Sequence, residues 1–279
     1  MIDKSHEQTD KMLIGLEKSL KKQYLEKFLQ IKSEIKDVVG EMDLSMAKTP
    51  IERYQLAQKY KRLNKLNENI PLMLNETNKL AVKEVNKSMF DVYKTNYTQG
   101  IEFLSVLLAI KVPNKYDLNN SEVNENIKEE KSPFDMLAVD DMRDITELRK
   151  VIRRQFVTAI MNGESSAQMV ERIQKVTEAK LSDIVRIART ETTRIENKAR
   201  LDAYQVGKDM GYKMVKRWVC VKDKKTRESH KHADGQTVEI DKPFIVDGEE
   251  LMQPGDKNGS AGNVINCRCT MIAGIVKNS

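Results

Sequence analysis

The chain has 279 residues, with 48 Lys and Arg against 42 Asp and Glu, a formal net charge of +6, and 5% aromatic residues. This length suits one large or two modest domains, and the composition favours a helix-rich, partly solvent-exposed molecule over a compact barrel. No apolar run approaches the ~20 residues that span a bilayer, three cysteines are too few for a disulfide scaffold, and the polar start is unlike a secretory signal. We therefore expect a protein that is made in the cytoplasm and has no membrane span.

The first predicted element is a long amphipathic helix that stops at Gly40. Its apolar residues recur every three or four positions from Leu13 to Val38, which places them on one stripe of a helix. This stripe packs either against the rest of the chain or against a partner. Self-association through the helix at residues 10–39 is one form of the second possibility.

Two more helices and a short apolar segment are expected next. Thr49-Pro50 has the pattern of an N-cap followed by proline at the first helical position, so a helix is predicted over about 51–67. Pro71 is expected to open another helix. A separate apolar segment follows at 101–111.

The sequence then becomes acidic and polar. Residues 117–147 hold ten acidic residues against three bases. We interpret 113–133 as an exposed acidic loop or linker, and a solvated surface is the simplest explanation of its charge.

Helical patterning resumes near Met136 and stops at Gly163. A last long helix is predicted from Ser182, a favourable N-cap residue, to Gly211. Strand-like pieces separated by turns follow at 214–221, 237–240 and 263–275. The predicted fold class is α+β, with a helical region at 1–112, the linker at 113–133, and a domain at 134–279 whose helices run to about 211 and whose β-rich module covers 212–279.

The terminal module gathers the side chains that could carry chemistry. All three cysteines and two of the three histidines fall between Cys220 and Cys269. Thiolate and imidazole are ligands that zinc prefers, so one hypothesis is a site made of His230, Cys267 and Cys269, with Cys220 or His232 as the fourth ligand. The single residue between Cys267 and Cys269 is not the spacing of a zinc knuckle. A disulfide, or a hydrogen-bonded turn cluster with no cofactor, would also account for these residues.

A catalytic role is a further hypothesis for the same region. A metal-dependent nuclease or a general acid–base pair could be built from His230, His232 and the acids Glu228 and Asp234. The sequence has no Gly-rich phosphate loop, His-Glu-x-x-His motif or nucleophile elbow. We therefore predict that the protein is not an enzyme.

The segment R-T-E-T-T-R at 189–194 is dense in groups that form ion pairs. Glu191 and Arg194 are three residues apart, so they can pair on one helix face. A salt-bridged helix that docks onto the terminal module explains this segment better than an active-site acid does.

A basic cluster lies in the same module. Residues 213–231 carry eight bases against two acids. Clustered Lys and Arg bind phosphates without reading sequence, so we predict contact with the DNA backbone; strand edges protected by lysine would explain the same cluster without DNA. The residues assigned to DNA are Lys216, Arg217, Lys222, Lys224, Lys225 and Lys231.

Several ordered blocks then form a recognisable pattern: the stretch from Ile187 to Tyr204, Trp218, the D-x-x-x-R-x-S-H-x-x-A-D-G run from Asp223 to Gly235, Pro254-Gly255-Asp256, and the N-C-R-C run that ends at Cys269. Together they resemble the phage Mu F-like head morphogenesis family. The motif residues that this resemblance assigns are Arg189, Glu191, Arg194, Trp218, Asp223, Arg227, Asp234, Gly235, Asp256 and Asn266.

The resemblance implies a minor head protein of a tailed bacteriophage. Such a protein lies inside the procapsid or virion, associates with the portal, and aids assembly and the packaging or delivery of DNA. Its implied partners are the portal protein, packaged double-stranded DNA, and scaffold or major capsid protein. The family is not an established group of enzymes. The competing hypotheses are a nuclease or transferase that uses His230 and His232, and a cytoplasmic DNA-binding module.

The resemblance also bears on the metal. Many relatives carry what resembles a zinc-binding set, with cysteines where this chain has Arg227 and His230. Only His230, Cys267 and Cys269 then remain as candidate ligands here. A hydrogen-bond network centred on Arg227, reaching Asp223, Asp234 or loop carbonyls, could take the place of the metal.

Overall fold

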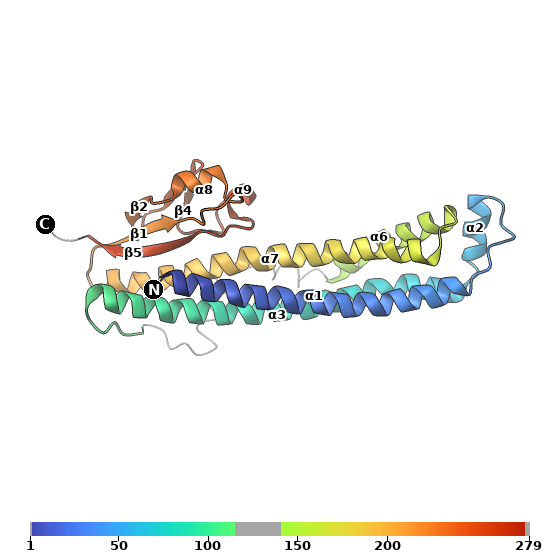
Figure 1. Cartoon of the computed structure of the whole chain (residues 1–279), viewed down its shortest axis with the longest axis horizontal. Helices are drawn as coiled ribbons and strands as arrows, with labels where there is room; N and C mark the ends of the chain where they lie inside the picture. Colours follow the sequence, from blue (N-terminus) through green and yellow to red (C-terminus); the bar gives the residue numbers. More distant parts are fainter. Residues whose placement is uncertain (1, 115–140, 277–279) are drawn as a thin grey trace. The chain divides into compact units, whose positions relative to one another are not determined.

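The computed structural model describes residues 2–114 and 141–276 (Figure 1). Its helices are α1 (Ile2–Gly40), α2 (Pro50–Ala57), α3 (Lys61–Leu108), α6 (Asp141–Met161), α7 (Ser166–Asp209), α8 (Glu228–Ala233) and α9 (Ala261–Val264). Its strands are β1 (Met214–Val219), β2 (Thr237–Glu239), β3 (Phe244–Val246), β4 (Glu249–Leu251) and β5 (Thr270–Ile275). The predicted α+β class is confirmed. None of the described helices has an apolar stretch of the length needed to cross a membrane.

The chain divides into two compact units, each built from separate stretches. Unit 1 comprises Met1–Glu17, Glu84–Pro133 and Arg186–Ser279, and unit 2 comprises Lys18–Lys83 and Phe134–Val185. Helices α1, α3 and α7 contribute residues to both units. This division follows packing, and the boundaries predicted along the sequence stay predictions. Most of the predicted acidic loop, from residue 115 onward, lies outside the described residues.

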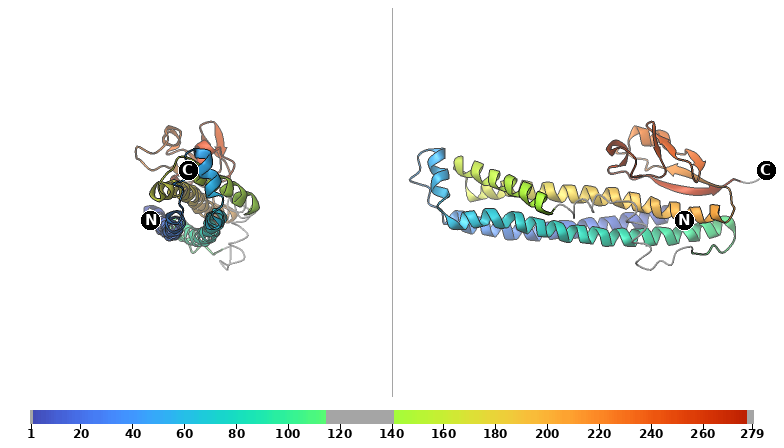
Figure 2. Two further views of the ribbon diagram at one scale, coloured as in Figure 1. Left: turned by 90° about the vertical axis from the view of Figure 1, so that its right-hand side faces the viewer. Right: turned by 180° about the vertical axis from the view of Figure 1, so that it is seen from behind.

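Unit 2 is built around an apolar core. Segments of α1, α3, α6 and α7 supply it, and Figure 2 shows these helices running alongside one another. The stripe predicted on the first helix lies in this core, where Phe28, Ile31, Ile35 and Val38 are buried. Burial of such side chains stabilises a helix whose propensity alone would not. Any self-association through residues 10–39 would therefore have to use the opposite face of α1.

Helix α2 begins as predicted. The Thr49 side chain accepts the N–H of Glu52, the Glu52 carboxylate accepts the N–H of Thr49, and Pro50 occupies the first helical position. The helix ends at Ala57, about ten residues earlier than expected.

Pro71 does not open a helix, because it lies inside α3. A proline in a helix interior removes one backbone hydrogen bond and costs about 3 kcal/mol. Its neighbours Ile70 and Leu74 are fully buried in the core of unit 2, and their burial favours continuing the helix. The helix runs on to Leu108 and absorbs most of the separate segment predicted at 101–111.

Helix α7 is longer than predicted. It starts at Ser166, so Ser182 lies well inside it and is not an N-cap. The cap is Ser165, whose hydroxyl accepts the N–H of Gln168 at 3.3 Å while the Gln168 side chain accepts the N–H of Ser165 at 2.8 Å. Gly211, with φ +90°, follows the end of the helix as predicted.

The C-terminal module of unit 1 contains two small antiparallel sheets. One has the order β2-β1-β5 and sets Trp218 opposite Met271, and the other is the β3–β4 hairpin, which the sequence pattern did not predict. The hairpin turn Asp247-Gly248 has positive φ at both residues, as an Asp-Gly turn of this kind requires. The strand predicted from 263 starts only at Thr270, because Asn263 lies in α9 and Asn266 adopts φ +54°.

Candidate functional site

One face of α7, within and just after the R-T-E-T-T-R segment, supports the candidate site. Thr193 Oγ1 donates to the carbonyl of Cys267 at 2.5 Å, and Asn197 Nδ2 donates to the carbonyl of Cys269 at 3.1 Å. Residues four apart share one helix face. Helix α7 therefore holds the N-C-R-C turn in place within unit 1.

Glu191 and Arg194 form the predicted ion pair, and both side chains are buried. The Arg194 carbonyl accepts a hydrogen bond from Gln253 Nε2 at 3.3 Å. Gly255, with φ +78°, approaches so closely that a Cβ there would lie 3.1 Å from the Arg194 Cα. The segment is thus a docking surface for the module, as its ion-pair spacing predicts.

Asp223 stabilises the loop before α8. Its carboxylate accepts two hydrogen bonds from the Arg268 guanidinium, at 2.6 and 2.7 Å, and two from backbone N–H groups of its own turn. The guanidinium, with these N–H groups, holds the pKa of Asp223 well below its ordinary value. Asp223 therefore pairs with Arg268, so among the alternative partners suggested for Arg227, Asp223 is engaged elsewhere.

Other motif residues fix neighbouring turns. Asp234 accepts the N–H of Cys220 at 3.0 Å, and Asp256 accepts the N–H of Met252 at 2.7 Å. Gly235 has φ +82°, a conformation that glycine adopts without strain. These residues act on the backbone, which accounts for their place in the motif without a catalytic role.

His230, Cys267 and Cys269 converge in the core of the module. All three side chains are buried, and their candidate ligand atoms lie within 4.8 Å of one another. His230 Nδ1 is 3.3 Å from Cys269 Sγ and 3.6 Å from Cys267 Sγ. The structure brings together the three candidate ligands, while Cys220 and His232 fall outside this group. All three cysteines are free thiols.

The two histidines lie on opposite sides of helix α8. Residues two apart on a helix point in nearly opposite directions, so His230 is buried against Trp218 whereas His232 is exposed. The His230–His232 pair of the catalytic hypothesis is therefore not formed.

The two thiols of the cluster are strongly coupled. The hydrogen bond that Cys267 receives from the Cys269 thiol, with the contribution of His230, lowers the pKa of Cys267. The same hydrogen bond, together with burial, raises the pKa of Cys269.

These donors fit three corners of a zinc site. With zinc about 2.3 Å from sulfur and about 2.0–2.1 Å from nitrogen, a tetrahedron separates N and S by about 3.6 Å. The observed N–S distances of 3.3 and 3.6 Å match this edge. His230 Nε2 is buried and has no hydrogen-bond partner. No fourth His, Cys, Asp or Glu joins the group among the described residues.

Arg227 lies three residues before His230. Its Nη2 donates to the carbonyl of Ile265, in the turn that leads to Cys267. The predicted bond from Arg227 to a loop carbonyl is therefore confirmed.

A cavity of about 460 Å³ adjoins this region of unit 1. Cys267 and Arg227 line it, together with bases and acids from α1, α7 and the module: Arg189, Lys225, Arg268, Asp10, Glu17 and Glu196. His6 also lines it and contacts Glu196 at 2.8 Å. Burial opposes the charged form of His6, but the hydrogen bond to Glu196 and the negative charges of Glu196 and Asp10 together outweigh it and raise the pKa of His6.

A buried polar network centred on Arg200 was not predicted from the sequence. The guanidinium donates to Thr270 Oγ1 at 2.8 Å and to Ser5 Oγ at 3.0 Å, and it pairs with Glu196 at 2.8 Å. The spacing of Glu196 and Arg200, four apart on a predicted helix, was an available signal. Nothing in the sequence marks the partner on α1.

The basic residues assigned to DNA do not share one environment. Lys216 is fully buried, its Nζ donates to the carbonyl of Met252 at 2.6 Å, and its ammonium lies 5.2 Å from the centroid of the Phe244 ring. Lys216 therefore faces the interior and cannot meet a DNA backbone, which corrects its assignment. The strand alternation that exposes Arg217 turns Lys216 inward.

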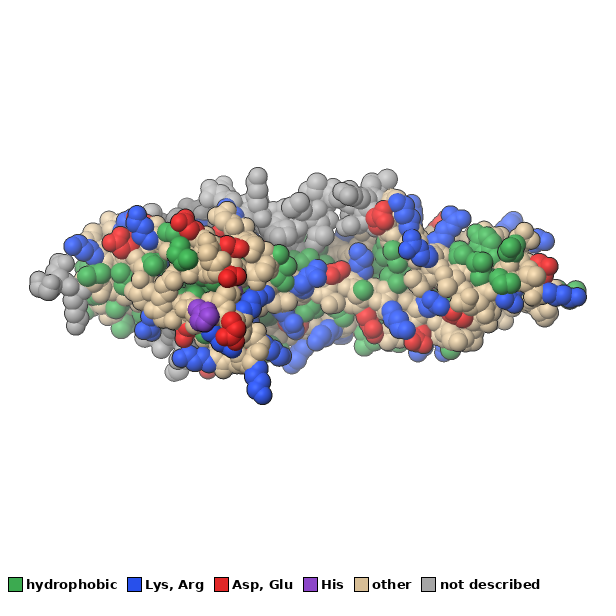
Figure 3. All heavy atoms as spheres, turned by 90° about the horizontal axis from the view of Figure 1, so that it is seen from above, with side chains coloured by type: hydrophobic (Ala, Val, Ile, Leu, Met, Phe, Trp, Pro, Cys, Tyr) green, Lys and Arg blue, Asp and Glu red, His purple; other side chains and the backbone are tan. Residues whose placement is uncertain are grey.

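The remaining five basic residues are exposed: Arg217, Lys222, Lys224, Lys225 and Lys231. Lys231 pairs with Glu228 at 2.6 Å, and Lys222 approaches Asp234 to 3.6 Å. Figure 3 shows Lys and Arg side chains interspersed with carboxylates on the face that it draws.

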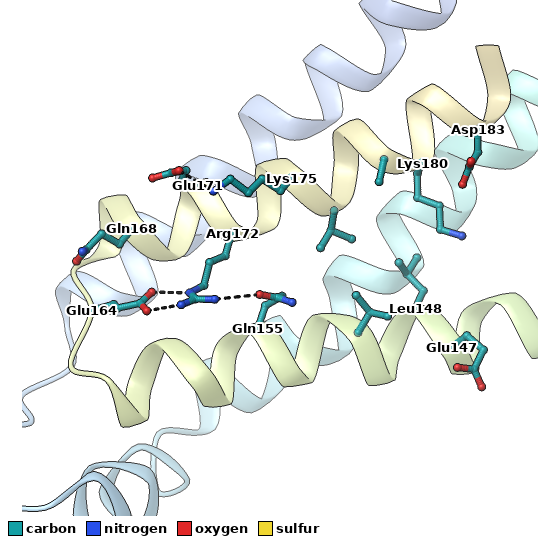
Figure 4. Close-up of a pocket in the computed structure, with 13 residues that line it drawn as sticks. Glu147, Leu148, Gln155, Glu164, Gln168, Glu171, Arg172, Lys175, Lys180 and Asp183 are labelled. Carbon is teal, nitrogen blue, oxygen red and sulfur yellow. Dashed lines mark hydrogen bonds and ion pairs between the residues drawn. The ribbon is translucent and has the colours of Figure 1, made fainter. Parts of the chain in front are cut away.

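A second cavity, of about 620 Å³, lies in unit 2 between α6 and α7 (Figure 4). Leu148, Val151 and Val176 supply apolar lining, and Arg172 bridges Glu164 and Gln155 near the α6–α7 turn. Its lining holds no histidine or cysteine. This cavity therefore has none of the imidazole and thiol groups that mark the terminal module.

Residues 150–272 match the family described as Phage Mu protein F like protein. This match, together with the similarity to a minor head protein given below, confirms the resemblance to phage head morphogenesis proteins.

Two relatives define the range of this similarity. Minor head protein GP7 of Bacillus phage SPP1 is 25% identical over 270 residues, which cover 96% of this chain and 86% of GP7. NAD(+)--arginine ADP-ribosyltransferase EFV of Enterococcus faecalis (strain ATCC 700802 / V583) is 33% identical over 126 residues, which cover 45% of this chain. The match spans only 26% of that larger protein.

Among solved structures, a computationally designed three helix bundle matches 71% of this chain and 83% of its own, with 16% identity and a TM-score of 0.16. This score is too low to support any argument about the fold.

Proposed function

We propose that this protein is a minor head protein of a tailed bacteriophage that acts inside the procapsid. There it associates with the portal, aids assembly together with scaffold or major capsid protein, and contacts packaged DNA without reading its sequence. Its role is structural and not enzymatic.

The observation that supports this proposal most is the extent of the similarity to GP7. It covers 96% of this chain and 86% of the minor head protein, so it includes the helical region as well as the family domain. A similarity of this length favours a shared role over a shared module. Portal association is the finer part of the proposal, and co-purification of the portal protein with tagged full-length chain tests it.

Contact with DNA is supported by the exposed bases of the module. Lys224 and Lys225 lie on the loop before α8, and both are exposed. Each phosphate contact releases counterions, so binding of this kind weakens steeply with salt.

The test is a gel-shift titration with double-stranded fragments of unrelated sequence. We expect Lys224→Glu/Lys225→Glu to weaken binding by at least tenfold at low salt and to flatten its salt dependence. Lys21→Glu/Lys22→Glu makes the same charge change at exposed positions of α1 in unit 2 and is the matched control. Equal binding by the two double variants, or preference for one DNA sequence, contradicts the proposed contact.

The non-enzymatic role is tested against the transferase name of EFV and against the nuclease hypothesis. Full-length protein is incubated with NAD⁺ and an arginine-containing acceptor, and separately with DNA and Mg²⁺ or Zn²⁺. We expect no consumption of NAD⁺ and no cleavage of DNA. Turnover that His232→Ala abolishes would favour the enzyme.

A further inference from the structure

We infer that His230, Cys267 and Cys269 form a three-ligand site for a thiophilic divalent cation such as zinc, whose fourth position is left to a small exogenous ligand, water or a thiolate. The inference goes beyond the proposed function and does not depend on it.

The three ligands come from two parts of the module that the fold holds rigidly. His230 is on α8, whereas Cys267 and Cys269 lie on the turn that α7 fixes through Thr193 and Asn197. Side chains 37 and 39 residues apart thus meet at the N–S distances of a tetrahedral site. Nδ1 is the nitrogen that His230 presents to both thiols, so it is the atom that would bind the cation.

The fourth corner is where this chain departs from a closed site. Arg227 precedes His230 by the two-residue gap that paired zinc ligands use, so a ligating side chain at 227 is the change expected to close the site. A guanidinium cannot coordinate a cation because it has no lone pair to give while it stays protonated. Arg227 instead bonds the carbonyl of Ile265, beside the turn that carries Cys267.

Of the three ligands, Cys267 lies nearest to a cavity of unit 1. Both Arg227 and Cys267 line the cavity of about 460 Å³ in unit 1. We therefore place the open position on the cavity side of the cluster. A structural zinc site is closed by four protein ligands, whereas a site with three keeps an exchangeable position.

The first experiment is metal analysis of full-length protein purified without chelator under reducing conditions. We expect about one equivalent of zinc, and Co²⁺ as a probe is expected to give a thiolate-to-metal charge-transfer band. Cys269→Ser should abolish this band, and Cys220→Ser, the same change at a neighbouring buried cysteine outside the group, should keep it. Less than about half an equivalent of metal, or a Cys267–Cys269 disulfide under these conditions, overturns the site.

The second experiment addresses the open position and uses a residue that is only partly buried. Added 2-mercaptoethanol should shift the d–d bands of the Co²⁺-loaded wild-type protein. Arg227→Cys supplies a fourth thiolate, so we expect at least tenfold tighter Zn²⁺ binding and no response to the added thiol. Arg227→Ala, the control for loss of the guanidinium, should still respond and should not bind more tightly by that margin. A wild-type spectrum that ignores the thiol, or an Arg227→Cys variant that binds no tighter, overturns the open fourth position.

Discussion

Helix α7 contributes to two cores that differ in how many polar side chains it buries in them. In unit 2 it buries Met169, Val170 and Ile173 among apolar neighbours. In unit 1 the same helix buries charged and polar side chains, among them Glu196, Asn197 and Arg200, each no more than 2% exposed. Apolar burial has no direction, whereas a buried polar group must find a partner in a defined geometry. The apolar half thus supplies stability, and the polar half specifies how the terminal module sits on its helix within unit 1.

The largest effect is expected where the polar core loses a charge. Arg200→Met leaves Glu196 buried with His6 as its remaining charged partner, and removing one member of a buried ion pair costs about 3–5 kcal/mol. Trp218 is the single tryptophan and is buried in unit 1, so its fluorescence during urea unfolding reports the free energy of unfolding of this unit.

Arg189→Met on the same helix is the matched control. Arg189 pairs with Glu17 at 2.6 Å but its side chain is 47% exposed, so its loss should cost about 1 kcal/mol or less. If the two variants lose equal stability, the buried network contributes no more than a surface pair, and the contrast between the two cores fails.

A second, smaller effect concerns the buried lysine of β1. Burial lowers the pKa of Lys216 from 10.5 to about 8. The unfolded chain therefore binds more protons than the folded one between these values, so the stability of unit 1 should rise as pH rises through this window. A difference of this size corresponds to at most about 3 kcal/mol.

Urea unfolding followed by Trp218 fluorescence at pH values of about 7.5, 9 and 10.5, which span this window, measures the rise. Lys216→Met should remove it, whatever its effect at neutral pH. Lys213→Met changes an exposed lysine nearby and should keep the wild-type slope. Parallel pH profiles for the wild type and Lys216→Met would show that the interior leaves this ammonium unperturbed.

The difference between the cores also explains what could be predicted from the sequence. Local spacing along the chain was enough to predict the apolar stripe from Leu13 to Val38 and the cap at Thr49. The helix end at Gly40 and the α+β class followed from patterns of the same local kind. The triad of His230, Cys267 and Cys269 was identified by residue type, but its convergence depends on the docking of α8 and the N-C-R-C turn.

Errors arose where tertiary burial decided the outcome. Lys216 lies in a basic run, yet strand alternation turns it toward Phe244. The Arg200 network joins residues from α1, α7 and β5, and no spacing along the chain relates them. Pro71 and Ser182 are favourable at helix starts, but the apolar periodicity around each of them continues through the position.

The smallest expected effect is at Ser182, and the sign of the stability change there tests whether Ser182 caps a helix. If Ser182 capped a helix, Ser182→Ala would cost about 1 kcal/mol. Ser182 is exposed in the interior of α7, in unit 2, where alanine has the higher helix propensity, so we expect a gain of up to about 0.5 kcal/mol. Ser165→Ala is the matched change at the observed cap and should cost about 1 kcal/mol because the N–H of Gln168 loses its acceptor. Thermal unfolding followed by circular dichroism measures both, and a loss at Ser182 equal to that at Ser165 would mean that the helix in solution begins at the later serine.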